Sequence, residues 1–303
     1  MKLKEILGAI ALIAATAGTS AAQDTIKLGF ITKFPVPFFA TMENAAKAYA
    51  AAHPGVEITF GQGTSATDIE GQISLIESMV TNGVQGIALT PVDPTVAPAL
   101  DKAIQQAHKS RRQLGVESIG LWQLHRIDPK VSHEEQFGAI KTLLKDGDTL
   151  GILEGVPGVP SLDDRVKGML EGLKGVDVKI VGRGATNCTE ELGISVAEDL
   201  LTKNPDLKAI YAACGPPAAG AARAIKNAGI APDKIILVGF DFCCGEEEAL
   251  KDGIEDATVA QFPAKMADLG VDALVKSIQG EKVESLIDSG AALVTRDTMD
   301  QFK

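Results

Sequence analysis

The stretch LLTKNPDLKAIYAACGPPAAGAARAIKNAG (200–229) contains the pattern that decides the fold class. Its central part, LKAIYAAC (207–214), is a short apolar run bounded by turn residues, which is typical of a buried strand. The Ala/Gly-rich segment 217–229 follows it directly and reads as a helix. A buried strand followed at once by a helix predicts a parallel sheet covered by helices.

The same alternation of strand and helix runs through the rest of the chain. Strands are expected at 26–32, 56–63, 86–91, 148–155, 178–184, 234–241, 257–263 and 291–297. Helices are expected at 38–53, 68–83, 96–107, 161–175, 191–205 and 264–280. The two halves are similar in size and pattern, which predicts two similar α/β lobes, each a parallel sheet flanked by helices, and not one barrel.

The N-terminus has the features of a secretory signal peptide over residues 1–22. Lys2 and Lys4 precede a short apolar stretch at 7–18, and small residues end at Ala22, after which cleavage is expected. A buried N-terminal helix is the alternative reading. No cysteine stands at the cleavage point, so no lipid anchor is expected there. The remaining chain of about 280 residues favours two domains.

Composition narrows the expected partners. The net charge of −11 argues against nucleic acid and against anionic membranes. Aromatic residues make up 4% of the chain, which gives no sign of a broad apolar interface and favours a monomer. A soluble exported protein in the periplasm fits these features.

All four cysteines lie in the second half, at Cys188, Cys214, Cys243 and Cys244. An even number in an exported protein predicts disulfides. A bridge between adjacent residues is strained, so Cys188 and Cys214 are each expected to pair with Cys243 or Cys244. The spacing fits no zinc motif, and neither a metal nor a cofactor is expected.

Two polar residues stand where predicted strands end. Asp241 closes ILVGFD (236–241), and Gln261 lies in TVAQFP (258–263). Open α/β sheets place ligand groups at the carboxyl ends of their strands. Motifs of hydrolases, nucleotide-binding loops and metalloproteases are not found, so the chain is expected to bind a small polar molecule without acting as an enzyme.

Four stretches carry a resemblance to a known family: KFPVPFF (33–39), 83–103, 200–229, and the last two strands with ILVGFD and TVAQFP. They resemble periplasmic sugar-binding proteins of the ribose and galactose type, the soluble receptors of ABC importers. The resemblance implies the type I periplasmic binding protein fold, in which a sugar or polyol lies in a cleft between the lobes and a membrane permease is the partner. It implies an N-terminal lobe of 23–129 plus about 262–288, and a C-terminal lobe of about 130–261 plus 289–303.

The resemblance also implies a set of ligand contacts. Flat aromatic rings would face the C–H faces of a sugar, and Arg165 and Asp241 would hydrogen-bond adjacent hydroxyls. Cys214 stands where sugar binders usually carry Asn. Expected ligand-binding residues are Thr32, Lys33, Phe34, Phe38, Phe39, Arg165, Cys188, Thr189, Cys214, Asp241 and Gln261. Alternatives are a salt bridge from Arg165 to Asp163 or Asp164, and a helix cap at Asp241.

The resemblance to sugar-binding proteins fails at about 108–144, where the sequence resembles part of an aldo-keto reductase barrel. In that family a His at the position of His125 belongs to a catalytic tetrad, but segments for the other three members are missing here. The alternative function is therefore a reductase-derived fragment in a chimeric chain, with impaired or no ligand binding. Within the segment, 118–124 is expected as a strand and 133–147 as a helix.

Overall fold

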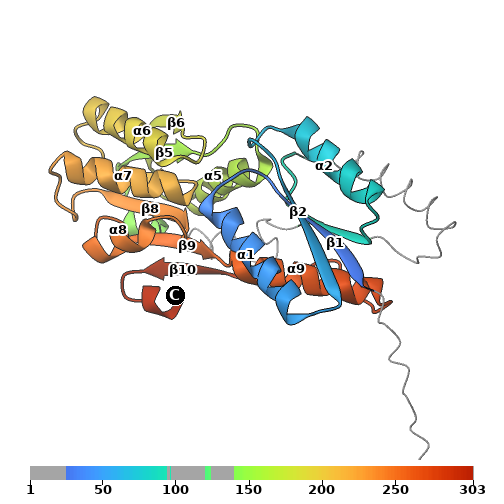
Figure 1. Ribbon diagram of the computed structural model, residues 1–303. Helices are drawn as coiled ribbons and strands as arrows, with labels where there is room; N and C mark the ends of the chain where they lie inside the picture. The colour runs from blue at the N-terminus through green and yellow to red at the C-terminus, as the bar shows by residue number, and fades with distance from the viewer. Residues whose placement is uncertain (1–24, 94–95, 97–119, 124–139, 303) are drawn as a thin grey trace, which may run out of the picture.

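The computed structural model describes residues 25–93, 96, 120–123 and 140–302, which form two sheets with helices on their faces (Figure 1). Residues 1–22, where a signal peptide is expected, and most of the reductase-like segment, including His125, lie outside the described residues. The first sheet has the order β2-β1-β3-β4 and is parallel throughout. Its strands are β1 (Ile26–Thr32), β2 (Val56–Gln62), β3 (Gly86–Leu89) and β4 (Gly120–Gln123).

Side chains alternate along β1 and build a core on each face of this sheet. Leu28 and Phe30 pack with α1 (Pro37–Ala52) and α9 (Pro263–Ile278) on one face. Ile31 packs with α2 (Ile69–Thr81) on the other face. A central strand buried on both faces is the arrangement that a continuous apolar run predicts.

The second sheet has the order β10-β9-β8-β7-β5-β6. Its strands are β5 (Thr149–Glu154), β6 (Lys179–Ala185), β7 (Ala209–Ala212), β8 (Ile236–Asp241), β9 (Ala257–Gln261) and β10 (Ala291–Thr295). All pairs are parallel except β10 with β9. A short 3-10 helix, Met299–Phe302, follows β10.

Helices cover both faces of the second sheet. On one face α5 (Pro160–Gly172) packs Met169 against Tyr211 and Phe240. On the other face lie α6 (Glu190–Lys203), α7 (Gly215–Asn227) and α8 (Glu246–Asp252). Close packing of α6 on α7 requires glycine, because a Cβ on Gly220 would stand 2.5 Å from the Glu190 carbonyl oxygen.

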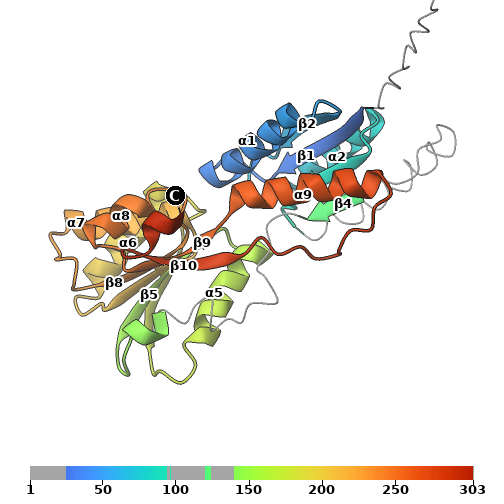
Figure 2. The ribbon, with the colours of Figure 1, turned by 90° about the horizontal axis from the view of Figure 1, so that it is seen from below.

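The chain passes between the sheets after β9 and again before β10. Figure 2 shows α9 lying beside α1 and β4, whereas β10 returns to β9 in the second sheet. Strand β4 at 120–123 lies within the strand expected at 118–124, and residues 140–143 are helical, as expected for the end of 133–147. No helix among the described residues is both long enough and apolar enough to cross a membrane.

Candidate ligand-binding cleft

A cavity lies between the two lobes, where the carboxyl ends of β1 and β8 meet the starts of α1, α5 and α7. Its lining consists of Lys33, Phe34, Val36, Phe38, Phe39, Val159, Ser161, Leu162, Arg165, Cys188, Cys214, Pro216, Asp241 and Cys244. The cavity measures about 40 Å³, far below the roughly 300 Å³ at the low end of small-molecule sites. A ligand the size of a sugar therefore enters only when the lobes separate.

A larger groove of about 480 Å³ opens on the outer side of the second lobe, between α5 and the ends of β5 and β6. Its charged lining residues include Glu154, Lys167 and Arg183, and Arg183 pairs with Glu154 at 3.5 Å. These side chains are solvated, whereas charged groups converge in buried positions only in the smaller cavity. The cavity between the lobes is therefore the better candidate site.

The aromatic wall of the cavity comes from the turn after β1 and the first turn of α1. The rings of Phe34 and Phe38 each meet Phe39 edge to face, with centroids 5.4 and 5.5 Å apart. Phe38 and Phe39 also belong to the core of the first lobe. They anchor α1 and at the same time present an apolar surface to the cleft.

Arg165 and Asp241 form a buried ion pair at the floor of the cavity. Arg165 Nη2 lies 3.1 Å from Asp241 Oδ1, and Nη1 donates to Asp241 Oδ2 at 3.3 Å and to the Ala213 carbonyl at 2.8 Å. The guanidinium also stands over the Phe240 ring, 4.0 Å from its centroid. The alternative pairing of Arg165 with Asp163 or Asp164 is not what the structure shows.

The backbone at this edge of the second sheet adopts uncommon conformations. Asn187 and Cys188, just after β6, have φ of 50° and 54°, and Asp241 and Phe242, at the end of β8, have φ of 104° and 54°. They are the only non-glycine residues with positive φ among those the structure describes. Strain of this kind persists where the surrounding structure fixes it, and it concentrates at functional sites.

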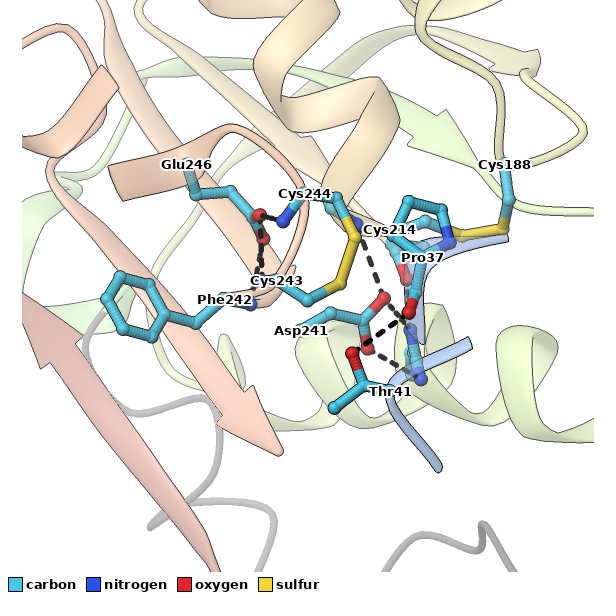
Figure 3. The surroundings of a disulfide bond; sticks show 12 residues. Pro37, Thr41, Cys188, Cys214, Asp241, Phe242, Cys243, Cys244 and Glu246 are labelled. Carbon is cyan, nitrogen blue, oxygen red and sulfur yellow. Dashed lines mark hydrogen bonds and ion pairs between the residues drawn. A yellow bond between two sulfur atoms is a disulfide. The ribbon is translucent and has the colours of Figure 1, made fainter. Parts of the chain in front are cut away.

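The cysteines pair differently from the expectation. Cys188 bonds to Cys214, and Cys243 bonds to its neighbour Cys244. The expected pairing across these two sets was wrong, because the turns after β6 and β7 bring Cys188 and Cys214 to a Cα–Cα distance of 5.7 Å. Figure 3 shows the Cys243–Cys244 bridge beside Asp241 in the turn that follows β8.

Behind this turn a second acid is held by backbone donors. The Glu246 carboxylate accepts from the N–H groups of Phe242, Cys243 and Cys244 at 2.9, 3.1 and 2.7 Å (Figure 3). Burial, followed by the charge of Asp241, raises the pKa of Glu246 to about 7. The contacts of Glu246 thus fix the conformation of the turn that carries Asp241 and the adjacent disulfide.

Lys33 lies on the other side of the cavity and reaches across it. Its side chain is buried, and Nζ donates to Ser161 Oγ of the second lobe at 3.3 Å. Burial, and then the positive charge of Arg165, lowers the pKa of Lys33 to about 8. Cys243 of the second lobe packs against the apolar core of the first lobe. The two lobes are therefore in contact around the cavity.

Three expected contact residues do not line this cavity. The Thr32 hydroxyl donates to Glu43 at 2.9 Å inside the first lobe, and Thr189 caps α6 by accepting from the Leu192 N–H at 3.4 Å. Gln261 ends β9 beside the crossing into α9, and its buried Oε1 has no hydrogen-bond partner among the described residues. The cavity gathers the other eight expected residues.

Several lining residues were not expected from the sequence. Ser161, Val159 and Leu162 come from the loop before α5 and from its first turn, and Pro216 and Cys244 follow β7 and β8. The segment 155–161 contains two Gly and two Pro directly after a buried strand. This composition is the sequence feature that could have indicated a turn at the carboxyl end of the sheet, where ligands bind.

Comparison with known proteins agrees with this geometry. The periplasmic binding protein domain matches residues 28–111 and 126–282. The aldo/keto reductase family matches residues 90–152, which confirms the resemblance of that segment. The D-ribose/D-allose-binding protein of Pseudomonas aeruginosa is 32% identical over 85% of this chain and 85% of its own length. The ribose import binding protein RbsB of Escherichia coli is 26% identical over 97% of this chain and 98% of its own length.

Solved structures show the same two-lobe architecture. A solute-binding protein of Agrobacterium vitis with bound D-fucose is 28% identical, with a TM-score of 0.79 over 91% of this chain and 97% of that one. One from Burkholderia graminis in complex with D-arabinose is 28% identical, with a TM-score of 0.78 over the same shares. On the family match, the relatives and the shared fold, this chain belongs to the periplasmic binding protein family.

Proposed function

We propose that this chain is the exported substrate-binding protein of an ABC importer and that it binds a sugar or related polyol between its lobes. The observation that carries the proposal is the cavity where the aromatic wall meets the buried Arg165–Asp241 pair. Relatives named for ribose and allose, and structures holding D-fucose and D-arabinose, support this ligand class.

The arrangement supports recognition by closure. Phe34, Phe38 and Phe39 of the first lobe would face the apolar side of a sugar ring, while Asp241 would accept hydrogen bonds from its hydroxyls. The ion pair with Arg165 holds the Asp241 carboxylate in a fixed orientation before the ligand arrives. Closing the lobes would remove water and strengthen each of these bonds.

The proposal includes the partners and the location. The signal segment would direct the chain to the periplasm, where the monomeric closed form would dock on a membrane permease. The first lobe would comprise 23–129 with about 262–288, and the second about 130–261 with 289–303. N-terminal sequencing of the exported protein should find Gln23 first.

Isothermal titration of the purified exported protein against pentoses, hexoses and polyols tests the ligand class. We expect at least one of them to bind with micromolar or tighter affinity. A well-folded protein that binds none of these compounds would remove the sugar assignment.

The reductase-like segment supports a second, weaker candidate, an enzyme that reduces carbonyl groups with NADPH. Against it, no segment supplies the partners that His125 would need. The enzyme reading predicts carbonyl-dependent oxidation of NADPH that disappears in His125→Ala. We expect no such oxidation in either protein.

A further inference from the structure

Lys33 has an unusual environment for a lysine. Only 4% of its surface is exposed, and it lines the cavity between the lobes. Its one recorded partner among the described residues is the neutral Ser161 hydroxyl at 3.3 Å. Lysine is seldom this buried unless its charge is paired, so the missing counter-charge calls for an explanation.

The charges around the cavity do not balance. Among the described residues, three charged side chains line it, namely Lys33, Arg165 and Asp241. Both Asp241 oxygens are already engaged by Arg165. The positive charge of Lys33 is therefore left without a carboxylate of its own in the part of the cavity lining that the structure describes.

The acidic residues just behind the cavity lining pair with groups other than Lys33. Glu246 accepts three backbone N–H groups behind the Cys243–Cys244 turn and does not line the cavity. Glu43 accepts from Thr32 and pairs with Lys47 at 3.8 Å. Burial, and after it the positive charge of Arg165, disfavour the charged form of Lys33 and lower its pKa.

We infer that the ligand of this cleft carries a single carboxylate that Lys33 binds as its counter-ion, so that the substrate class is sugar acids, such as uronates or aldonates. This inference rests on the proposed function and narrows it. The Lys33 ammonium is buried in a cavity that aromatic rings and disulfide-bonded cysteines also line, so it has lost most of its hydration, and an anionic ligand would restore the lost stabilisation. Closure would bring the ligand carboxylate to the ammonium, while Asp241 remains available to its hydroxyls.

A carboxylate suits this site better than a phosphate. The cavity lining has one unmatched positive charge, which a monoanion neutralises and a phosphate monoester of about −1.5 to −2 exceeds. The rest of the cavity lining is largely apolar, so the second negative charge of a phosphate would be left without a partner.

Titration calorimetry at pH 7 with matched ligand pairs tests the inference. In each pair the acid carries a carboxylate in place of one primary hydroxyl and keeps the other hydroxyls: D-galactose with D-galacturonate, D-glucose with D-glucuronate, and ribitol with D-ribonate. D-Galactose 1-phosphate is tested beside them. Hydrogen bonds to charged groups lead us to expect the best acid to bind at least about tenfold more tightly than its neutral partner.

Two variants of Lys33 test whether this residue causes the preference for acids. Lys33→Met keeps the length and removes the charge, so the ratio of acid to neutral affinity should fall about tenfold or more. Lys33→Arg keeps the charge and should retain part of that ratio. The control is Lys27→Met, which removes an exposed lysine from β1, the strand before Lys33, and should leave the ratio unchanged.

The outcomes separate this inference from the sugar-binding proposal. A preference for neutral sugars would overturn the sugar-acid assignment and leave a sugar receptor. A preference for D-galactose 1-phosphate would overturn the inference that the ligand's acid group is a carboxylate. An acid preference that survives in Lys33→Met would overturn the role of Lys33. Failure of the folded protein to bind any member would overturn both proposals.

Discussion

Lys33 and Ser161 are joined across the cleft, from the turn after β1 to the first turn of α5, with 3.3 Å between Nζ and Oγ. The two residues belong to different lobes, so their hydrogen bond links the lobes across the cleft. A hydrogen bond to a charged group stabilises by roughly 1.5–3 kcal/mol.

Ser161→Ala should therefore loosen the ligand-free protein. Removing the hydroxyl should lower the closed-to-open ratio by about tenfold or more. A distance label on each lobe, read by single-molecule fluorescence, measures this ratio. Ser74→Ala removes an exposed hydroxyl from α2 and serves as the control. Equal ratios in both variants would show that the bond contributes nothing to closure.

Lys33→Met should stabilise the ligand-free fold at pH 7. The pKa of Lys33 is lowered from 10.5 to about 8, so between these pH values the unfolded chain binds more protons than the folded one. The wild type carries the full penalty below pH 8 and loses it as the pH rises towards 10.5. We expect the variant to gain roughly 1 kcal/mol at pH 7, because the relief of a penalty of about 3 kcal/mol is partly offset by loss of the hydrogen bond to Ser161; the difference should shrink above pH 8.

Urea unfolding of both proteins at several pH values measures this difference. Arg165 and Asp241, the other charged residues that line the cavity in the described part of the chain, are present in both proteins, so the comparison isolates Lys33. A sugar acid should correspondingly bind more weakly as the pH passes 8. A constant difference in stability from pH 7 to 10 contradicts the lowered pKa.

Asp241→Asn should weaken both the fold and ligand binding. Arg165 would lose its charged partner in a buried site, which costs about 3 kcal/mol. Loss of two charge-assisted bonds to ligand hydroxyls should weaken affinity at least about 100-fold. Asparagine tolerates positive φ well, so the change tests the charge more than the backbone.

Thermal unfolding and titration calorimetry measure the two effects. Asp233→Asn alters an exposed acid of the second lobe and should change neither. An Asp241→Asn protein that keeps wild-type affinity would place the ligand elsewhere.

The two disulfides should differ in their contribution to stability. Cys188 and Cys214 are 26 positions apart, and their bridge restricts the unfolded chain, whereas the Cys243–Cys244 bridge closes almost no loop. Replacing the first pair by Ser should cost about 2–4 kcal/mol, and replacing the second should cost much less. Peptide mapping should find both bridges in exported protein, and denaturation of the two double variants compares them.

The order of strands and helices was predictable because each apolar run is short and ends in turn residues, as at 207–214 and 236–241. Asp241 could be expected because its place at a strand end and the family resemblance agreed, whereas Arg165, near a helix start, was expected from the resemblance alone. The cysteine pairing could not, because four cysteines allow three connectivities and strain favoured the wrong ones. Lys33 at a strand end is ordinarily solvated, and its burial depends on the approach of the second lobe.

Helix α9 has a consequence for how the protein is made. Met266, Val271 and Leu274 of α9 complete the core of the first lobe, although they follow almost the whole second lobe in the chain. A chain that crosses a membrane from its N-terminus therefore cannot finish its first lobe until residue 278 has emerged. Late arrival of this helix would keep the precursor open and able to be threaded, and would delay native structure until translocation is nearly complete.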